Sequence, residues 1–136
     1  MIHTDIDIKD ALHSWIILSD LAKAVSGKVY KDQRPLNSTK EDIIIAVIAR
    51  DADTQIQRAT ANVNIYVPDV RRGKEAIEDT ARLRTLCTTA ATLFEYHDVG
   101  DAIYELDSQE VMAIPGVDWH VINNRISIRF CNEETN

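Results

Sequence analysis

The chain has 136 residues, of which 45% are hydrophobic and 27% charged, and its formal net charge is −7 at pH 7. A single domain of this size buries a core without disulfides or metals, and the acidic excess argues against a general nucleic-acid-binding protein, which needs a basic face. The N-terminus lacks the basic and apolar regions of a signal peptide, and no stretch approaches the ~18 apolar residues of a membrane span. We therefore expect one soluble domain over residues 1–136, with mobile ends at about residues 1–5 and 132–136.

Two helices are predicted near the N-terminus. Apolar residues recur at helical spacing over residues 7–18, and Thr4 with Asp7 forms a weak capping box. Ser19 is a suitable N-cap for a short second helix. Gly27 lies where a left-handed residue would end that helix.

Three strands are predicted next. Residues 28–30 indicate a short strand, and residues 31–40 a loop with Pro35 and Asn37. The β-branched run over residues 43–48 is typical of a strand buried on both faces. Apolar and polar residues then alternate over residues 54–67, which predicts a long half-exposed strand that forms an antiparallel hairpin with the previous one.

The longest predicted helix covers residues 74–95, where apolar residues follow one stripe. Its first residues include Glu75, Glu78 and Asp79, which favour the positive end of the helix dipole. The basic cluster of residues 71–74 directly precedes them, and we interpret it as a solvated loop in preference to a phosphate site.

Two long strands close the chain. The first covers residues 102–113 and is expected to bend near residues 107–108. A turn at residues 115–116 leads to the last strand, residues 119–131. The apolar positions of that strand change from odd to even numbers, so we predict a β-bulge at residues 123–124.

The expected fold is α+β, with the order helix, helix, strand, strand, strand, helix, strand, strand. Most strand connections are hairpin-like, which predicts a mainly antiparallel sheet of about 4–5 strands. Two main helices are expected to pack on one face of this sheet.

The sequence shows no catalytic pattern. None of the four histidines has the i, i+4 spacing of a helical metal site, and no nucleophile or phosphate-binding motif occurs. Cys87 and Cys131 fit no metal spacing and are interpreted as core residues. We therefore predict that the protein is not an enzyme and uses no metal or cofactor.

The polar side of the 54–67 strand is the most prominent candidate surface. Such a mixed-polarity strand face serves either as a protein contact surface or as an ordinary solvent face, and the two interpretations carry equal weight. The residues on this side are Arg58, Thr60, Asn62, Asn64 and Tyr66.

A family resemblance covers roughly residues 8–130. A helix is followed by Ser-Asp-Leu-Ala-Lys-Ala-Val-Ser-Gly at residues 19–27 and Lys-Val-Tyr-Lys-Asp-Gln-Arg-Pro at residues 28–35. A hydrophobic strand, a strand ending in Ala-Asn-Val-Asn-Ile-Tyr-Val (residues 61–67) and a long helix follow. This order resembles the small tail-completion proteins of tailed bacteriophages and prophages, of the tail terminator type related to the lambda tail terminator.

The resemblance implies an α+β structural subunit without a cofactor, which assembles as a ring, commonly a hexamer, at the tail end or the head–tail junction. Its partners would be copies of itself and the tail-tube and neck proteins, with no specific nucleic-acid or membrane binding. It would lie in the bacterial cytoplasm during assembly and later in the virion. Ring contacts are heterologous, and sheet edges and loops would make them. The candidate contact residues are Arg34, Arg58, Asn62, Asn64, Tyr66, Arg71 and Arg72.

Two other functional classes stay open at this point. One is a soluble module that binds a small ligand or another protein of unknown identity. The other is a small enzyme with an unrecognised site.

Overall fold

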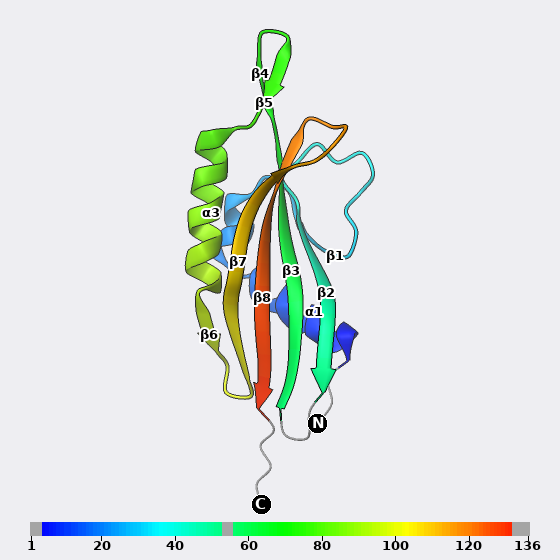
Figure 1. Ribbon diagram of the computed structural model, residues 1–136, viewed down its shortest axis with the longest axis vertical. Helices are drawn as coiled ribbons and strands as arrows, with labels where there is room; N and C mark the ends of the chain where they lie inside the picture. Colours follow the sequence, from blue (N-terminus) through cyan, green and yellow to red (C-terminus); the bar gives the residue numbers. More distant parts are fainter. Residues whose placement is uncertain (1–3, 53–55, 132–136) are drawn as a thin grey trace, which may run out of the picture.

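The computed structural model describes residues 4–52 and 56–131, so most of the ends expected to be mobile lie outside the described residues. Three helices, α1 (Asp5–Ile16), α2 (Asp20–Ala24) and α3 (Thr80–Phe94), accompany one large sheet (Figure 1). The expected α+β class is confirmed. Within the described residues, no helix has the length and apolar character needed to cross a membrane.

The large sheet has six strands, in the order β1-β2-β3-β8-β7-β6. β1 runs parallel to β2, and all other neighbours are antiparallel. The sheet is therefore mixed, and larger than the 4–5 strands predicted. Its strands are β1 (Val29–Lys31), β2 (Ile43–Ala52), β3 (Ile56–Pro68), β6 (Tyr96–Asp98), β7 (Ala102–Ala113) and β8 (Trp119–Cys131).

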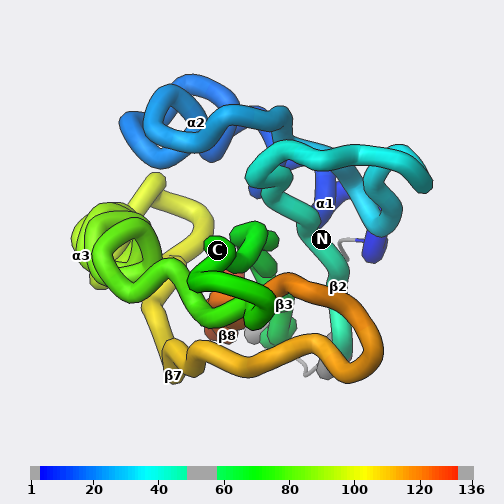
Figure 2. Tube along the Cα trace, turned by 90° about the horizontal axis from the view of Figure 1, so that it is seen from above, coloured from blue at the N-terminus to red at the C-terminus, as the bar shows by residue number. Residues whose placement is uncertain are grey.

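All three helices cover the same face of the large sheet (Figure 2). The alternation predicted for β3 is confirmed, because its odd-numbered residues from Ala59 to Val67 are buried against the helices. They pack with apolar residues of β8 and of the helices. Full burial of one large apolar side chain contributes about 1.5–3 kcal/mol to the free energy of folding. The helical side of this core includes Ile8, Leu12, Ile16, Leu83, Leu86 and Phe94.

The cap predicted for the first helix is confirmed, and so is the start of the second. Thr4 and Asp7 exchange two hydrogen bonds of 3.1 Å, and Ser19 caps α2. Gly27 does not have the left-handed conformation that was predicted. A Cβ atom there would lie 2.0 Å from Asp42 Oδ1 and 2.5 Å from the Glu41 carbonyl oxygen, so the close approach of two chain segments requires this glycine.

The prediction that the long helix starts at Lys74 is wrong. Residues 70–77 form a separate hairpin of β4 (Val70–Arg72) and β5 (Glu75–Ile77), and Gly73 at φ 63° makes its turn. The helix begins only after Asp79, whose side chain accepts a hydrogen bond of 3.2 Å from the Arg82 amide. Glu75 and Glu78 therefore lie before the helix, and Asp79 alone of the three acidic residues caps it.

The β-bulge predicted at residues 123–124 is also wrong. β8 pairs with β3 without a register shift, and Asn124 occupies a fully buried position on the core side. Its Nδ2 donates to the Val63 carbonyl oxygen at 3.1 Å, and its Oδ1 accepts from Gln109 Nε2 at 2.8 Å. Because these bonds satisfy the amide, a polar residue fits the core without a bulge.

Register shifts occur elsewhere. One lies in β2 between Val47 and Ala49, and another lies in β7 between Leu106 and Ser108. The second lies where a bend in β7 was predicted. Burial on both faces, predicted for residues 43–48, holds for residues 43–45, whereas Ile48 is exposed.

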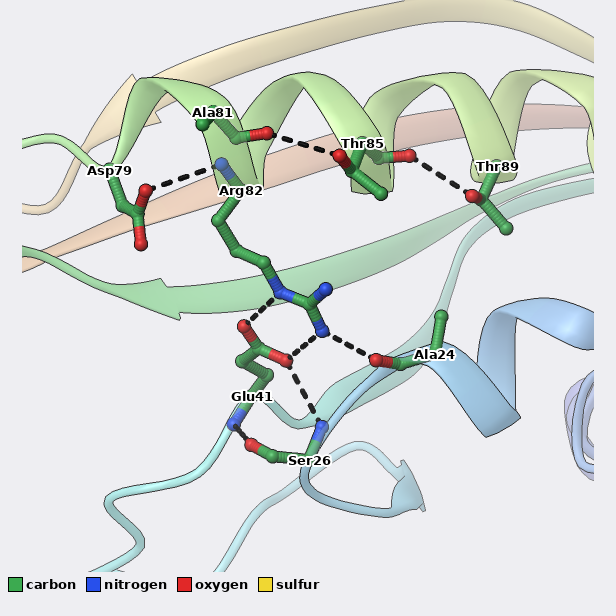
Figure 3. A network of polar contacts seen from close by, with 8 residues as sticks. All are labelled: Ala24, Ser26, Glu41, Asp79, Ala81, Arg82, Thr85 and Thr89. Carbon is green, nitrogen blue, oxygen red and sulfur yellow. Dashed lines mark hydrogen bonds and ion pairs between the residues drawn. The ribbon is translucent and has the colours of Figure 1, made fainter.

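Arg82 joins the start of α3 to two other segments (Figure 3). Its guanidinium donates to both carboxylate oxygens of Glu41 at 2.7 Å and to the Ala24 carbonyl oxygen at the end of α2. Glu41 Oε1 also accepts from the Ser26 amide at 3.0 Å. These hydrogen bonds, those from Arg82 above all, lower the pKa of Glu41 against the opposing effect of burial.

A pH-dependent stability follows from the lowered pKa of Glu41. The stabilisation is complete above the pKa that Glu41 has in the unfolded chain, and it is lost as the pH falls through the lower pKa of the folded state. We expect Glu41→Gln to reduce the free energy of unfolding at pH 7 by about 1–2 kcal/mol. Urea unfolding between neutral and acidic pH measures this, and the variant should show a flatter pH profile. The exposed carboxylate Glu105 provides the control, and an equal effect of Glu105→Gln would contradict the assignment to Glu41.

Candidate functional site

The predicted contact residues of β3 alternate with its buried residues, so they lie together on the sheet face opposite the three helices of the described residues (Figure 2). Cross-strand neighbours in β8 extend this face, and Asn123 Nδ2 donates to Asn64 Oδ1 at 2.7 Å. The Oδ1 atom of Asn62 is buried there and has no hydrogen-bond donor among the described residues. We call this surface the polar sheet face, and it consists of Arg58, Thr60, Asn62, Asn64, Asn123, Arg125, Ser127 and Arg129.

One end of the polar sheet face is apolar and covered by a loop. Arg34 of the loop lies between two aromatic rings, with its Cζ atom 4.7 Å from the centroid of Tyr66 and 4.5 Å from that of Trp119. Arg34 Nε is also 3.3 Å from a carboxylate oxygen of Asp42, whose side chain is almost fully buried. The cation–π contacts and the ion pair together hold residues 32–42 against the sheet.

The structure thus brings Arg34 and Tyr66 together, as two of the predicted contact residues. Sequence reasoning missed Trp119 and Asp42, which complete this contact. The odd-numbered position of Trp119 was the available signal, because it places the ring on the face away from the core. The odd-numbered position of Trp119 was interpreted as evidence of a bulge. It is explained instead by the contacts of Trp119 with the loop on the sheet face away from the helices.

Three projecting segments meet at this end of the molecule, which we call the loop end (Figure 1). They are the loop of residues 32–42, the β4–β5 hairpin and the turn of residues 114–118 between β7 and β8. Each exposes an apolar side chain, namely Leu36 (93% exposed), Val70 (41%) and Val117 (54%). A shallow groove between the loop and the turn is lined by Arg34, Pro35, Leu36, Ser38, Tyr66, Ile114, Val117 and Trp119.

The hairpin carries Arg71 and Arg72, the last two predicted contact residues, away from the polar sheet face. Both are exposed, and Arg71 Nη2 lies 3.7 Å from an oxygen of Asp118 in the neighbouring turn. The structure therefore divides the predicted residues between two surfaces. Arg58, Asn62 and Asn64 lie on the polar sheet face, whereas Arg34, Tyr66, Arg71 and Arg72 belong to the loop end.

His120 anchors the base of the hairpin to the large sheet. Its Nδ1 lies 2.7 Å from Asp69 Oδ1, directly before β4, and its Nε2 lies 3.8 Å from Glu78 Oε1, directly after β5. The Asp69 amide also donates to the Asp118 carbonyl oxygen at 3.0 Å. Both ends of the hairpin are therefore held, while its tip extends from the body.

A second groove of 770 Å³, which we call the helical groove, lies between the first two helices and α3. The ring of Trp15 stacks on His97 at its floor, with centroids 4.1 Å apart, and Leu18 at its rim is 79% exposed. The groove is lined by Trp15, Leu18, Ser19, Asp20, Thr88, Thr89, Thr92, Leu93 and His97.

Neither a metal centre nor an activated thiol is formed by the described residues. Among the described residues, no group of three or more His, Cys, Asp or Glu side chains could hold a metal. Cys87 and Cys131 are both free and partly buried. Burial raises the pKa of Cys87, which disfavours the thiolate that a nucleophile requires.

Two comparisons with known proteins give no match. No family model matches the chain, and no curated protein is significantly similar to it. The function is therefore argued from the polar sheet face and the loop end.

Proposed function

We propose that the chain is a structural subunit of a bacteriophage or prophage tail. In this proposal, copies of the chain form a ring that caps the tail tube or joins the tail to the head. The resemblance of residues 19–35, and of the element order predicted from the sequence, to tail terminator proteins supports this proposal. The structure adds β4 and β5 before α3, and β6 after it, to that predicted order.

The observation that carries the proposal is the loop end. Three chain segments meet there, and each presents an apolar side chain to solvent. Exposed apolar residues that gather at one place are typical of protein contact surfaces. Arg34 fixes the loop against Trp119, and Arg71 lies near Asp118 of the turn. The three segments are therefore positioned relative to one another, as a docking surface for a tube end requires.

The expected result is a ring of several subunits. Size-exclusion chromatography with light scattering should give a mass several times that of one chain, and electron microscopy should show closed rings. Labelled rings should bind one end of tail tubes assembled from the tube protein of the same element. A chain that stays monomeric at high concentration and does not bind tube ends would contradict the proposal.

A pair of variants tests whether the loop end makes the tube contact. Leu36→Ser combined with Val117→Ser should abolish binding to tube ends, because it removes exposed apolar area without touching the core. Leu18→Ser removes a similarly exposed leucine from the helical groove and serves as the matched control.

The helical groove favours a second candidate function, a module that binds a small ligand or a peptide. Its aromatic floor and apolar rim are typical of such sites. A ligand or peptide whose binding is lost in Leu18→Ser, but kept in the variant with Leu36→Ser and Val117→Ser, would support this second function instead.

A further inference from the structure

The two outermost strands of the large sheet are short, and each covers only part of its neighbour. β6 pairs with residues 103–105 of β7, so residues 106–113 of β7 have no strand beside their outer edge in the described part of the chain. β1 pairs with residues 43–45 of β2, which leaves the outer edge of β2 open from residue 46 onward. Open strand edges present unpaired backbone groups that readily accept another strand.

The open sections of β7 and β2 lie at opposite ends of the sheet. Following the register across the strands, Gln109 pairs with Asn124, Asn124 with Val63, and Val63 with Ile45. The open part of β7 is therefore level with the part of β2 that β1 covers. If copies stand side by side at one height in a ring, β2 of one copy cannot extend the open edge of the next, so another element must cover that edge.

The open β7 edge belongs to an acidic side of the molecule. Residues 85–124 contain no lysine or arginine, and their carboxylates are Glu95, Asp98, Asp101, Glu105, Asp107, Glu110 and Asp118. Glu105, Asp107 and Glu110 of β7 are all exposed, and none forms an ion pair with another described residue. Two such edges would repel each other, which disfavours a symmetric β7–β7 dimer.

The β4–β5 hairpin has the opposite charge and lies at the same end as the open β7 section. The hairpin carries three exposed positive charges, at Arg71, Arg72 and Lys74, and one negative charge, at Glu75. Each of its strands has three residues and pairs only with the other, and a hairpin this short is marginally stable in water. A partner surface would therefore fix its conformation, and the contacts of His120 hold its base in place for such an encounter.

We propose that the β4–β5 hairpin of one copy adds to the open β7 edge, residues 106–113, of the next copy. The inference rests on the ring proposed above and names the contact between its subunits. The arginines of β4 would lie near Asp107 and Glu110. Val70, which shares a strand face with Arg72, would meet Met112, which shares one with Glu110 and is 39% exposed. Hairpin and edge are different surfaces of the same chain, so the interface is heterologous and generates a closed ring when the rotation closes.

Charge reversal on each element tests the contact. The hairpin variant carries Arg71→Glu and Arg72→Glu, and the edge variant carries Asp107→Lys and Glu110→Lys. All four side chains are exposed, so both variants should fold and keep the circular dichroism spectrum of the wild type. Each variant alone should show a dissociation constant for self-association raised at least about tenfold, because like charges then face each other.

A mixture of the two variants provides the decisive measurement. The reversed hairpin complements the reversed edge, and the native hairpin of the edge variant complements the native edge of the hairpin variant. A 1:1 mixture should therefore restore the wild-type mass by light scattering, in assemblies where the two variants alternate. Arg84→Glu with Lys23→Glu introduces the same charge change elsewhere and should leave self-association unaffected.

The outcomes separate this inference from the proposed function. Rings that survive both reversals would overturn the hairpin contact and leave the ring proposal standing. Two variants that fail alone and are not restored by mixing would also overturn it. Assembly that follows the charge pattern but yields open filaments without affinity for tube ends would support the hairpin contact and contradict the proposed function.

Discussion

Replacing Asn124 by aspartate should lower the free energy of unfolding by about 3–5 kcal/mol at pH 7, because it places an unpaired charge in the core. Asn124 is fully buried, and its Nδ2 donates to the Val63 carbonyl oxygen. A carboxylate has the same shape but no donor, so it would set an anionic oxygen against that carbonyl. Urea unfolding measures the loss, which should shrink at acidic pH, where the carboxyl group is protonated and donates again.

Asn123→Asp is the matched control. Asn123 lies next in the chain but on the polar sheet face, and it is only partly buried. Water can solvate the new carboxylate there, so we expect a loss below about 1 kcal/mol. Equal losses in the two variants would contradict the assignment of Asn124 to a satisfied core position.

The variant Gly27→Ala should lose about 3 kcal/mol of stability through overpacking. The added methyl group would lie 2.0 Å from the carboxylate of Asp42 and 2.5 Å from the backbone oxygen of Glu41. Glu41 is held by Arg82, and Asp42 is an ion-pair partner of Arg34, so neither can move without breaking other contacts. Thermal unfolding should show a lowered midpoint, accompanied by faster proteolysis in residues 32–42.

Gly73→Ala separates this crowding from the general cost of replacing a glycine. Gly73 has a φ of 63° in the hairpin turn, and nothing lies within 4 Å of the position of an added Cβ. Its replacement should cost only about 1 kcal/mol, from backbone strain. A larger loss at Gly73 than at Gly27 would contradict the close approach of residues 27 and 42.

The long-range periodic patterns predicted the fold class, whereas local exceptions to those patterns were misinterpreted. The alternation of β3 was read correctly because one face of the strand is buried along its length. The failure at β8 has one physical cause. A polar residue, Asn124, occupies a core position because Gln109 from the next strand and the Val63 backbone satisfy it, and such partners cannot be found from the sequence of β8 alone.

The hairpin was missed for a related reason. Residues 74–79 contain several carboxylates that would suit the first turn of a helix. The helix starts after Asp79 because the side chain of Asp79 accepts a hydrogen bond from the Arg82 amide and so acts as the N-cap. Three-residue strands leave almost no periodic signal. The division of the candidate contact residues between the polar sheet face and the loop end depended on a turn at Gly73 that the sequence did not resolve.

The position of β8 in the sheet determines when the chain can fold. Of the strands in the described residues, β8 is synthesised last, yet it lies between β3 and β7, and its partners in β3 are about 60 residues earlier in the chain. Until β8 is synthesised, the edge of β3 that faces away from β2 has no pairing strand. A nascent chain that ends before residue 119 therefore lacks the central strand of the sheet. Folding of the sheet is therefore expected to wait for the synthesis of β8 and to be slow, because the central pairing closes long loops.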